Sequence, residues 1–143
     1  MSWRSTTITP YHPDDEEPVI ALWHRCFPPE HLTAHNDPRT AIAQKLAYQP
    51  DLFFVAKVDG KIIGTTMAGY DGHRGWLYSV AVDPTHRRQN IGRQLLQHAE
   101  DALIKLGCNK INLQVRTSNA EVIAFYQQCG YKADDVLSMG KRI

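Results

Sequence analysis

The chain has 143 residues, a length typical of a single domain with one hydrophobic core. Its 16 lysines and arginines nearly balance 15 acids, for a net charge of +1, so we expect neither a nucleic-acid-binding nor a membrane-surface protein. The absence of a hydrophobic signal region or a membrane-length apolar run, together with 3 cysteines without metal-like spacing, predicts a cytoplasmic protein with free thiols.

The first third of the chain predicts one short strand and two helices. Residues 6–9 form the strand, and a proline follows it. The acids at 14–17 suit the first turn of a helix because they complement its dipole, and Pro28 and Pro29 end that helix. Asp37 followed by a proline predicts the N-cap of a second helix, which runs to about Tyr48. The apolar face of the first helix consists of Val19, Leu22, Trp23, Cys26 and Phe27.

Three antiparallel strands are predicted next, over residues 52–58, 61–70 and 75–82. Asp59-Gly60 is a strong two-residue hairpin turn between the first two, and residues 71–74 form the second turn. The third strand alternates in side-chain character. We expect one of its faces to carry Trp76, Tyr78, Val80 and Val82, and the other Leu77, Ser79 and Ala81.

A basic turn and a long helix follow the third strand. Pro84 forces the chain out of the sheet, and apolar residues at helical spacing from Ile91 to Leu106 predict a helix that Gly107 caps. The helix start directs free N–H groups and positive dipole charge beyond the strand, where an anion can bind. Charge is added there by Arg87, Arg88 and Arg93.

The last part of the chain predicts one more helix between strands. Residues 110–115 form a strand parallel to the strand at 75–82, because a helix connects the two. A helix over 119–129 ends at Gly130, and residues 131–133 and 136–141 close the sheet as a hairpin. The whole chain, 1–143, is therefore expected to be one α+β domain, with a mixed, mostly antiparallel twisted sheet, a parallel splayed strand pair at its centre and about four helices.

Two motifs resemble those of the GCN5-related N-acetyltransferase (GNAT) family. Arg87-x-x-Asn90-x-Gly92 is similar to the family's Arg/Gln-x-x-Gly-x-Gly/Ala loop, which grips the pyrophosphate of acetyl-coenzyme A through backbone amides. The segment from Asn119 to Tyr131 is similar to the later motif Asn-x-x-x-Ile-x-Phe-Tyr-x-x-x-Gly-Phe/Tyr. Asn90 departs from the family's glycine, but asparagine tolerates positive φ best among the other residues, so we expect the turn to be kept.

The resemblance implies the GNAT fold and an acetyl transfer. Acetyl-coenzyme A would be the co-substrate, without a metal, and a primary amine would attack it directly in a ternary complex. Val80 and Val82 would bind the pantetheine arm through their main chain, and Tyr126 would protonate the departing thiolate. The residues implied to bind the cofactor are Val80, Val82, Arg87, Arg88, Gln89, Asn90, Ile91, Gly92, Arg93, Asn119 and Tyr126.

The acceptor side is less well defined by the sequence. The expected partner is a small-molecule or peptide amine, with a homodimer left open, and the candidate contacts are Asn36, Asp37, Asp71, His73 and Tyr78. The general base stays open among Tyr78, Glu121, Asp71, His73 and a chain of waters.

Two alternatives compete with this interpretation. One is a protein of the same fold that binds acetyl-coenzyme A as a sensor or structural module without turning it over. The other is a nucleotide or nucleic-acid protein that uses the turn at 87–93, although this turn lacks interleaved aromatic residues.

Overall fold

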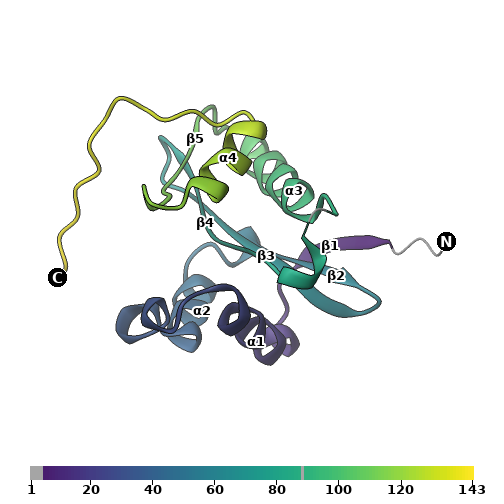
Figure 1. Ribbon diagram of the computed structural model, residues 1–143. Helices are drawn as coiled ribbons and strands as arrows, with labels where there is room; N and C mark the ends of the chain where they lie inside the picture. The colour runs from purple at the N-terminus through teal and green to yellow at the C-terminus, as the bar shows by residue number, and fades with distance from the viewer. Residues whose placement is uncertain (1–4, 88) are drawn as a thin grey trace.

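A five-stranded sheet with the order β1-β2-β3-β4-β5 forms the middle layer of the protein (Figure 1). The computed structural model describes residues 5–87 and 89–143. Neighbouring strands are antiparallel from β1 to β4, and β5 is parallel to β4. The antiparallel arrangement of β2, β3 and β4 and the parallel β5 confirm the prediction. The strands are β1 (Thr6–Pro10), β2 (Phe53–Val58), β3 (Lys61–Tyr70), β4 (Gly75–Val82) and β5 (Ile111–Leu113).

Helices cover both faces of this sheet. One face carries α1 (Glu16–Cys26) and α2 (Pro38–Ala47), and the opposite face carries α3 (Ile91–Lys105) and α4 (Ala120–Gln128) (Figure 1). Short 3-10 turns lie at Pro13–Asp15, Pro29–His31, Ala34–Asn36, Pro50–Leu52 and Pro84–His86. In the part of the chain described above, no helix is long and apolar enough to cross a membrane.

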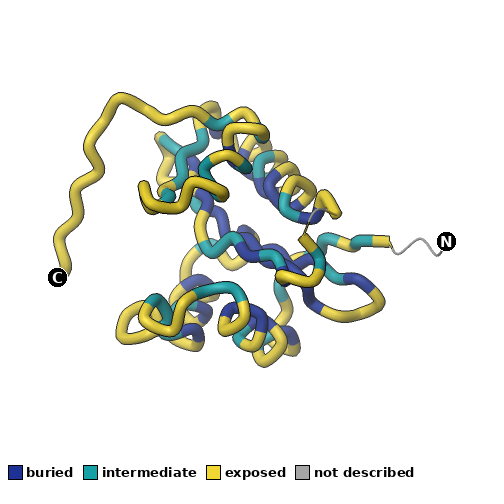
Figure 2. Tube along the Cα trace, in the orientation of Figure 1, coloured by how far each residue is buried: buried dark blue, intermediate teal, exposed yellow. Residues whose placement is uncertain are grey.

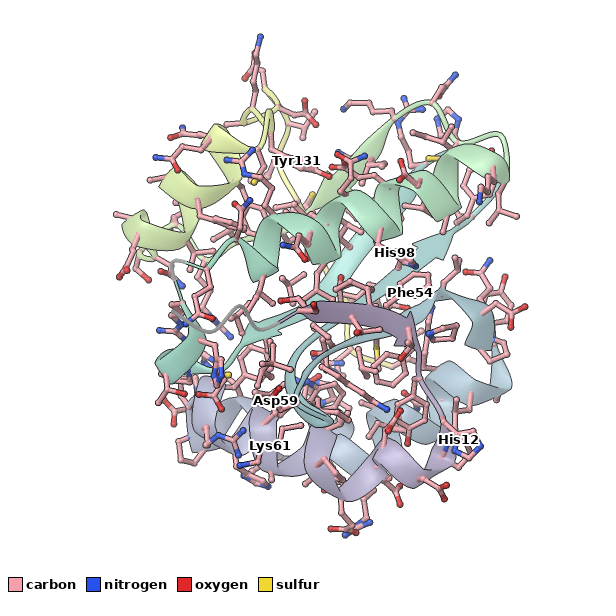
Figure 3. The ribbon with its side chains drawn as sticks, turned by 90° about the vertical axis from the view of Figure 1, so that its right-hand side faces the viewer. His12, Phe54, Asp59, Lys61, His98 and Tyr131 are labelled. Atoms are coloured by element: carbon pink, nitrogen blue, oxygen red, sulfur yellow. The ribbon has the colours of Figure 1, made fainter. Side chains whose placement is uncertain are left out.

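The sheet separates two apolar cores. Buried residues concentrate on the strands and on the helix surfaces that face them (Figure 2). On the α3 side, buried Phe54 and exposed His98 form a T-shaped ring pair at a centroid distance of 4.8 Å, and Figure 3 shows the two residues near each other. The core on the α1 side consists of Val19, Leu22, Trp23, Ile42, Phe53, Val55, Ile62, Met67 and Ala81.

The hairpin between β2 and β3 has the turn that its sequence predicts. Asp59 and Gly60 have φ values of 52° and 76°, the left-handed conformations that a two-residue hairpin turn of this type requires. Val58 therefore pairs with Lys61 directly. Figure 3 shows Asp59 and Lys61 side by side at this turn.

The predicted alternation along β4 is wrong in its second half, because β4 contains a β-bulge. Met67 of β3 pairs with Tyr78, but Thr65 pairs with Ala81, so β4 holds one more residue than β3 at this point. The extra residue is Ser79, whose φ is 52°. Tyr78 consequently lies on the α1 and α2 face, whereas Val80 packs with the cluster on the α3 face.

The bulge is held by a buried chain of hydrogen bonds from α1. The indole nitrogen of Trp23 donates to the hydroxyl of Thr65 over 2.9 Å, and that hydroxyl donates to the carbonyl of Ser79 over 3.0 Å. Thr65 and Trp23 are both buried, and the bond between them is shielded from water. The first helix thus fixes the position of the bend in β4.

The predicted C-terminal hairpin is also wrong. Residues 132–143 contain no strand and run outward as extended chain (Figure 1), so the parallel pair β4–β5 lies at one end of the described sheet. Aspartate is unfavourable in strands, and here Asp134 turns to the side to accept hydrogen bonds from Lys110 and Asn112, at 2.7 and 3.0 Å. Side chains instead of a backbone ladder therefore hold this segment, and its apolar residues Val136, Leu137, Met139 and Ile143 are exposed.

Candidate active site

β4 continues beyond the end of its pairing with β5, and we call the unpaired side of β4 after Leu77 the gap. The two strands pair only from Gly75 with Ile111 to Leu77 with Leu113, immediately before the bulge, while β4 continues to Val82. The backbone N–H of Asp83 donates to Ile63 of β3 over 2.8 Å, and backbone groups alternate in direction along a strand. The amides of Val80 and Val82 therefore face the gap, which is where the sequence predicts main-chain contacts to a ligand.

The N-terminus of α3 lies beyond the end of β4. Asn90 is its N-cap and adopts φ 67° and ψ 11°, so the turn is kept with asparagine in place of glycine, as predicted. Its side chain caps no N–H of the first turn, which leaves these donors available to an anion. Gln89 and Asn90 are exposed, whereas the side chain of Ile91 is buried in the core and only its backbone can face a ligand.

Glycine at position 92 has a packing explanation. A Cβ atom built there would lie 3.0 Å from the ring of Phe125 on α4, a distance at which the neighbour must move. Gly92 thus allows α3 and α4 to approach each other beside the gap. This contact alone explains why glycine is present at position 92. The predicted role of Gly92 in cofactor binding is compatible with the contact.

The arginines of the basic turn differ in their contacts. Arg87 is exposed at the turn, with its Nε 3.4 Å from the carbonyl oxygen of Val82. Arg93 extends to the end of α4, where its guanidinium lies 3.4 Å from the carbonyl oxygen of Gln128 and suits the negative end of that helix. Arg88, the third predicted arginine, lies outside the described residues.

An ion pair between Asp83 and Arg25 connects α1 to this turn, and it was not predicted. The guanidinium of Arg25 lies 2.7 Å from the carboxylate of Asp83, which also accepts hydrogen bonds from the amide and hydroxyl of Thr85. Burial by itself would raise the pKa of Asp83, but the hydrogen bonds from Thr85 and the charge of Arg25 outweigh it and lower the pKa to about 2. The two residues are 58 positions apart, so no local pattern could reveal the pair.

We expect Asp83→Asn to lower the free energy of unfolding at pH 7 by about 1 to 2 kcal/mol. The folded-state pKa is below the usual value of 3.8, so this stability is present above pH 4 and is lost as the pH falls through about 2. Urea denaturation at pH 7 and at pH 2.5 measures the difference. Asp14→Asn is the control, because its carboxylate is 93% exposed and should change stability by less than about 0.5 kcal/mol. An equal loss at both pH values would contradict a contribution from the charge.

Tyr126 lies on α4 with only 9% of its surface exposed. Its ring meets the ring of Tyr131 edge-on at 5.9 Å, and no hydrogen bond to its hydroxyl is formed within the described residues. Burial, followed by the nearby Cys129, raises the pKa of Tyr126 to about 12. Its hydroxyl therefore carries a proton at neutral pH, as a proton donor must.

One residue at each end of α4 holds this helix in place. The hydroxyl of Tyr131 donates to the carboxylate of Glu100 on α3 over 2.5 Å, and Figure 3 shows Tyr131 beside α3. Asn119 is the N-cap of α4, and its side chain accepts from the amide of Val122 over 3.4 Å. Capping is thus the role that this structure gives to Asn119, which was predicted to contact the cofactor arm.

Most predicted acceptor contacts have local structural partners. Asp71 accepts from the amides of His73 and Arg74 at 2.7 and 2.6 Å, so it stabilises its own hairpin turn, and these bonds lower its pKa. His73 is exposed at that turn. Asp37 caps α2 through the amide and hydroxyl of Thr40, both at 3.1 Å, and Asn36 is exposed before it.

Tyr78 is the predicted acceptor residue with a partner from a distant element. Its hydroxyl accepts a hydrogen bond from the amine of Lys45 on α2 over 2.8 Å. Lys45 was not among the predicted site residues. Its position among Ala41, Ile42 and Leu46 could have revealed it, because these residues predict an apolar helix face. A lysine buried on such a face must either bind a polar partner or lose its proton.

Metal coordination has no counterpart in the described residues. No three histidine, cysteine, aspartate or glutamate side chains there are grouped as metal ligands. The features gathered around the gap are backbone amides, a helix N-terminus, basic side chains and a protonated tyrosine.

Comparison with known proteins identifies the family. A sequence model of the Acetyltransferase (GNAT) family matches residues 17–131. An acetyltransferase of Pectobacterium atrosepticum is 44% identical over 133 residues, which are 93% of this chain and 92% of that protein. An acetyltransferase of Sodalis glossinidius is 45% identical over 137 residues, 95% and 94% of the two chains.

Solved structures share the fold. The PaiA N-acetyltransferase of Thermoplasma acidophilum, solved in complex with coenzyme A, superposes with a TM-score of 0.83 at 21% identity and covers 92% of each chain. The ribosomal-protein-S18-alanine N-acetyltransferase of Escherichia coli has a TM-score of 0.73 at 30% identity, covering 88% of this chain and 77% of that one. The chain therefore belongs to the GNAT family of acetyltransferases.

Proposed function

We propose that this protein transfers an acetyl group from acetyl-coenzyme A to a primary amine, with both reactants bound together. The observation that carries the proposal is the end of the β4–β5 pairing at Leu77, after which β4 continues past Val80 and Val82 without a paired strand on that side, toward the N-terminus of α3. The amides suit a ligand with amide groups of its own, and the helix start suits phosphates. Coenzyme A combines both features in one molecule.

The residues around the gap fit the separate parts of this co-substrate. The first-turn amides of α3, with Arg87 at the turn before it, would hold the pyrophosphate. The backbone of Val80 and Val82 would pair with the pantetheine arm as a neighbouring strand does. Acetyl-coenzyme A supplies a thioester whose carbonyl can be attacked by an amine.

Two groups of the protein would assist the attack. A backbone N–H at Val80 would donate a hydrogen bond to the thioester oxygen and stabilise the negative charge that develops there. Tyr126 would hold a proton for the departing thiolate, since its hydroxyl stays protonated at neutral pH. Holding both reactants side by side would supply most of the rate.

The acceptor amine would enter from the face of α1 and α2. Tyr78 lies on that face directly before the bulge, and its hydroxyl lies against the amine of Lys45 on α2. Asn36, Asp37, Asp71 and His73 remain candidates for the mouth of this site, together with the local roles described above.

A ligand-stability experiment followed by an amine screen tests the proposal. Coenzyme A and its acetyl form should raise the unfolding temperature, with about 1.4 kcal/mol added for each tenfold excess over Kd. Release of free thiol should then require one of a panel of amines: amino acids, peptide N-termini, lysine side chains, polyamines or aminoglycosides. Binding without thiol release would indicate a sensor or structural module, and no binding would overturn the proposal.

A further inference from the structure

Lys45 is a buried amine in the α1 and α2 half of the molecule. It lies in the last turn of α2, and only 6% of its surface is exposed. Its Nζ donates to the carbonyl oxygen of Ala68 on β3 and to the hydroxyl of Tyr78 on β4, and it lies 5.1 Å from the centre of the Tyr78 ring. These contacts leave one of the three N–H groups of a charged amine without a protein partner.

The charged groups on the neighbouring elements face elsewhere. Glu16 and Glu17 of α1 both pair with Arg39, at 3.3 and 2.6 Å. Asp37 caps the start of α2, and Asp71 is bound within its own turn on the β3–β4 hairpin. Within the described residues Lys45 therefore has no carboxylate partner, and Tyr78 is the titratable side chain in contact with it. Burial lowers the pKa of Lys45 to about 8.

A purely structural role explains only one of these contacts. β2 begins at Phe53, which pairs with Met67, so the following residues of β3 have no strand beside them on that side. Gln49 fills part of this place, because its side-chain amide bonds both the N–H and the carbonyl of Tyr70. Lys45 does the same for the carbonyl of Ala68, but a neutral amide would serve equally well and would carry no cost of burying a charge.

We infer that Tyr78 and Lys45 form a proton relay that deprotonates the acceptor amine as it attacks. This inference rests on the proposed acetyl transfer. In the neutral state, Lys45 donates one N–H to Ala68 and accepts the hydrogen bond from Tyr78. The Tyr78 oxygen takes a proton from the acceptor nitrogen while its own proton passes to the nitrogen of Lys45. One N–H bond of the acceptor breaks and one N–H bond of Lys45 forms, so the charge moves from acceptor to Lys45.

The relay has a defined pH dependence. It operates only when Lys45 is neutral, so kcat/KM should rise with pH and level off above about pH 8. Tyr78 touches the acceptor in this scheme, and Lys45 acts through it as a positioning and proton-accepting partner. Burial raises the pKa of Tyr78, so it passes a proton on and does not remain ionised.

Three variants separate a relay from a fixed charge or a packing role. Lys45→Arg keeps the positive charge and the donors but cannot become neutral. Lys45→Met removes the amine, and Tyr78→Phe removes the hydroxyl. With an amine identified in the screen, each should lower kcat/KM by about 100-fold and abolish the rise toward pH 8, with coenzyme A affinity unchanged. Lys57→Arg is the control, because Lys57 pairs with Asp15 at 3.3 Å outside this site and should keep both rate and pH profile. A Lys45→Arg enzyme with the wild-type pH profile would overturn the relay.

A titration of the wild-type protein tests the inference without turnover. Lysine labelled with carbon-13 at Cε is followed by NMR from pH 6 to 11, and the Lys45 signal is the one missing in Lys45→Arg. It should titrate near pH 8, well below the ordinary value of a lysine amine. Titration of Lys45 at its ordinary value of 10.5 would overturn the relay even if the protein binds coenzyme A and acetylates an amine.

Discussion

Tyr126→Phe is expected to slow turnover by about 100-fold while the affinity for coenzyme A changes little. The substitution removes the hydroxyl but keeps the ring, which packs beside Phe125 and Tyr131. Since the pKa of Tyr126 is raised to about 12, the wild-type hydroxyl stays protonated across the neutral range, and this residue should cause no loss of activity between pH 7 and 10. Steady-state kinetics with an active amine and calorimetry with coenzyme A measure the two quantities separately.

Tyr131→Phe is the matched control for this experiment. It removes a hydroxyl from the neighbouring ring, and with it the hydrogen bond to Glu100, so stability should fall while kcat stays within a factor of about two. An unchanged kcat in Tyr126→Phe would mean that the thiolate leaves without this proton, and that Tyr126 serves the packing of α4 alone.

Deletion of Ser79 is expected to weaken coenzyme A binding by at least about tenfold and to leave a cooperative fold. Without the extra residue, Thr66 would face a single residue of β4, and the side chains of Leu77, Val80 and Ala81 would keep their faces. The strand would lose its bend, because a bulge is what kinks and twists it. β4 could then stay beside the chain that follows Leu113, and the gap that exposes the amide of Val80 would close.

Ser79→Gly tests the bulge without removing it. Glycine adopts positive φ without the cost that serine bears at 52°, so stability should be equal or higher by up to about 1 kcal/mol and affinity should be unchanged. Calorimetry with coenzyme A and thermal unfolding of both variants make the comparison. Wild-type affinity in the deletion variant would show that the gap does not depend on the bend.

Local signals predicted most of the fold, and the errors arose where contacts distant in sequence decide the structure. The turn at Asp59-Gly60 and the left-handed Asn90 follow from the conformations these residues favour, so the sequence was sufficient for them. Ser79 has no such signature, and the buried bonds that hold its bulge come from Trp23 and Thr65, far away along the chain. The alternation rule therefore assigned the wrong face to half of β4.

The same reason limits the prediction of the site. The proposed cofactor side consists of backbone groups at the end of a strand and the start of a helix, and the order of the elements determines where these groups lie. The proposed acceptor side depends on which side chains α2 places against β4, and the contact of Lys45 with Tyr78 spans 33 positions. The C-terminal residues were predicted as strands from their sequence pattern. Hydrogen bonds from Lys110 and Asn112 to Asp134 hold this segment in place of the predicted hairpin.

The division of the apolar residues between the two sides of the sheet bears on how this protein can evolve. The buried cluster under α1 and α2 shares no residue with the clusters under α3 and α4. Substitutions in separate clusters affect stability almost additively, so a change beneath α2 can be accepted or rejected without reference to the packing of α3. Under the proposed function, the acceptor side beneath α2 can therefore change after gene duplication while the packing of α3 and α4 is retained.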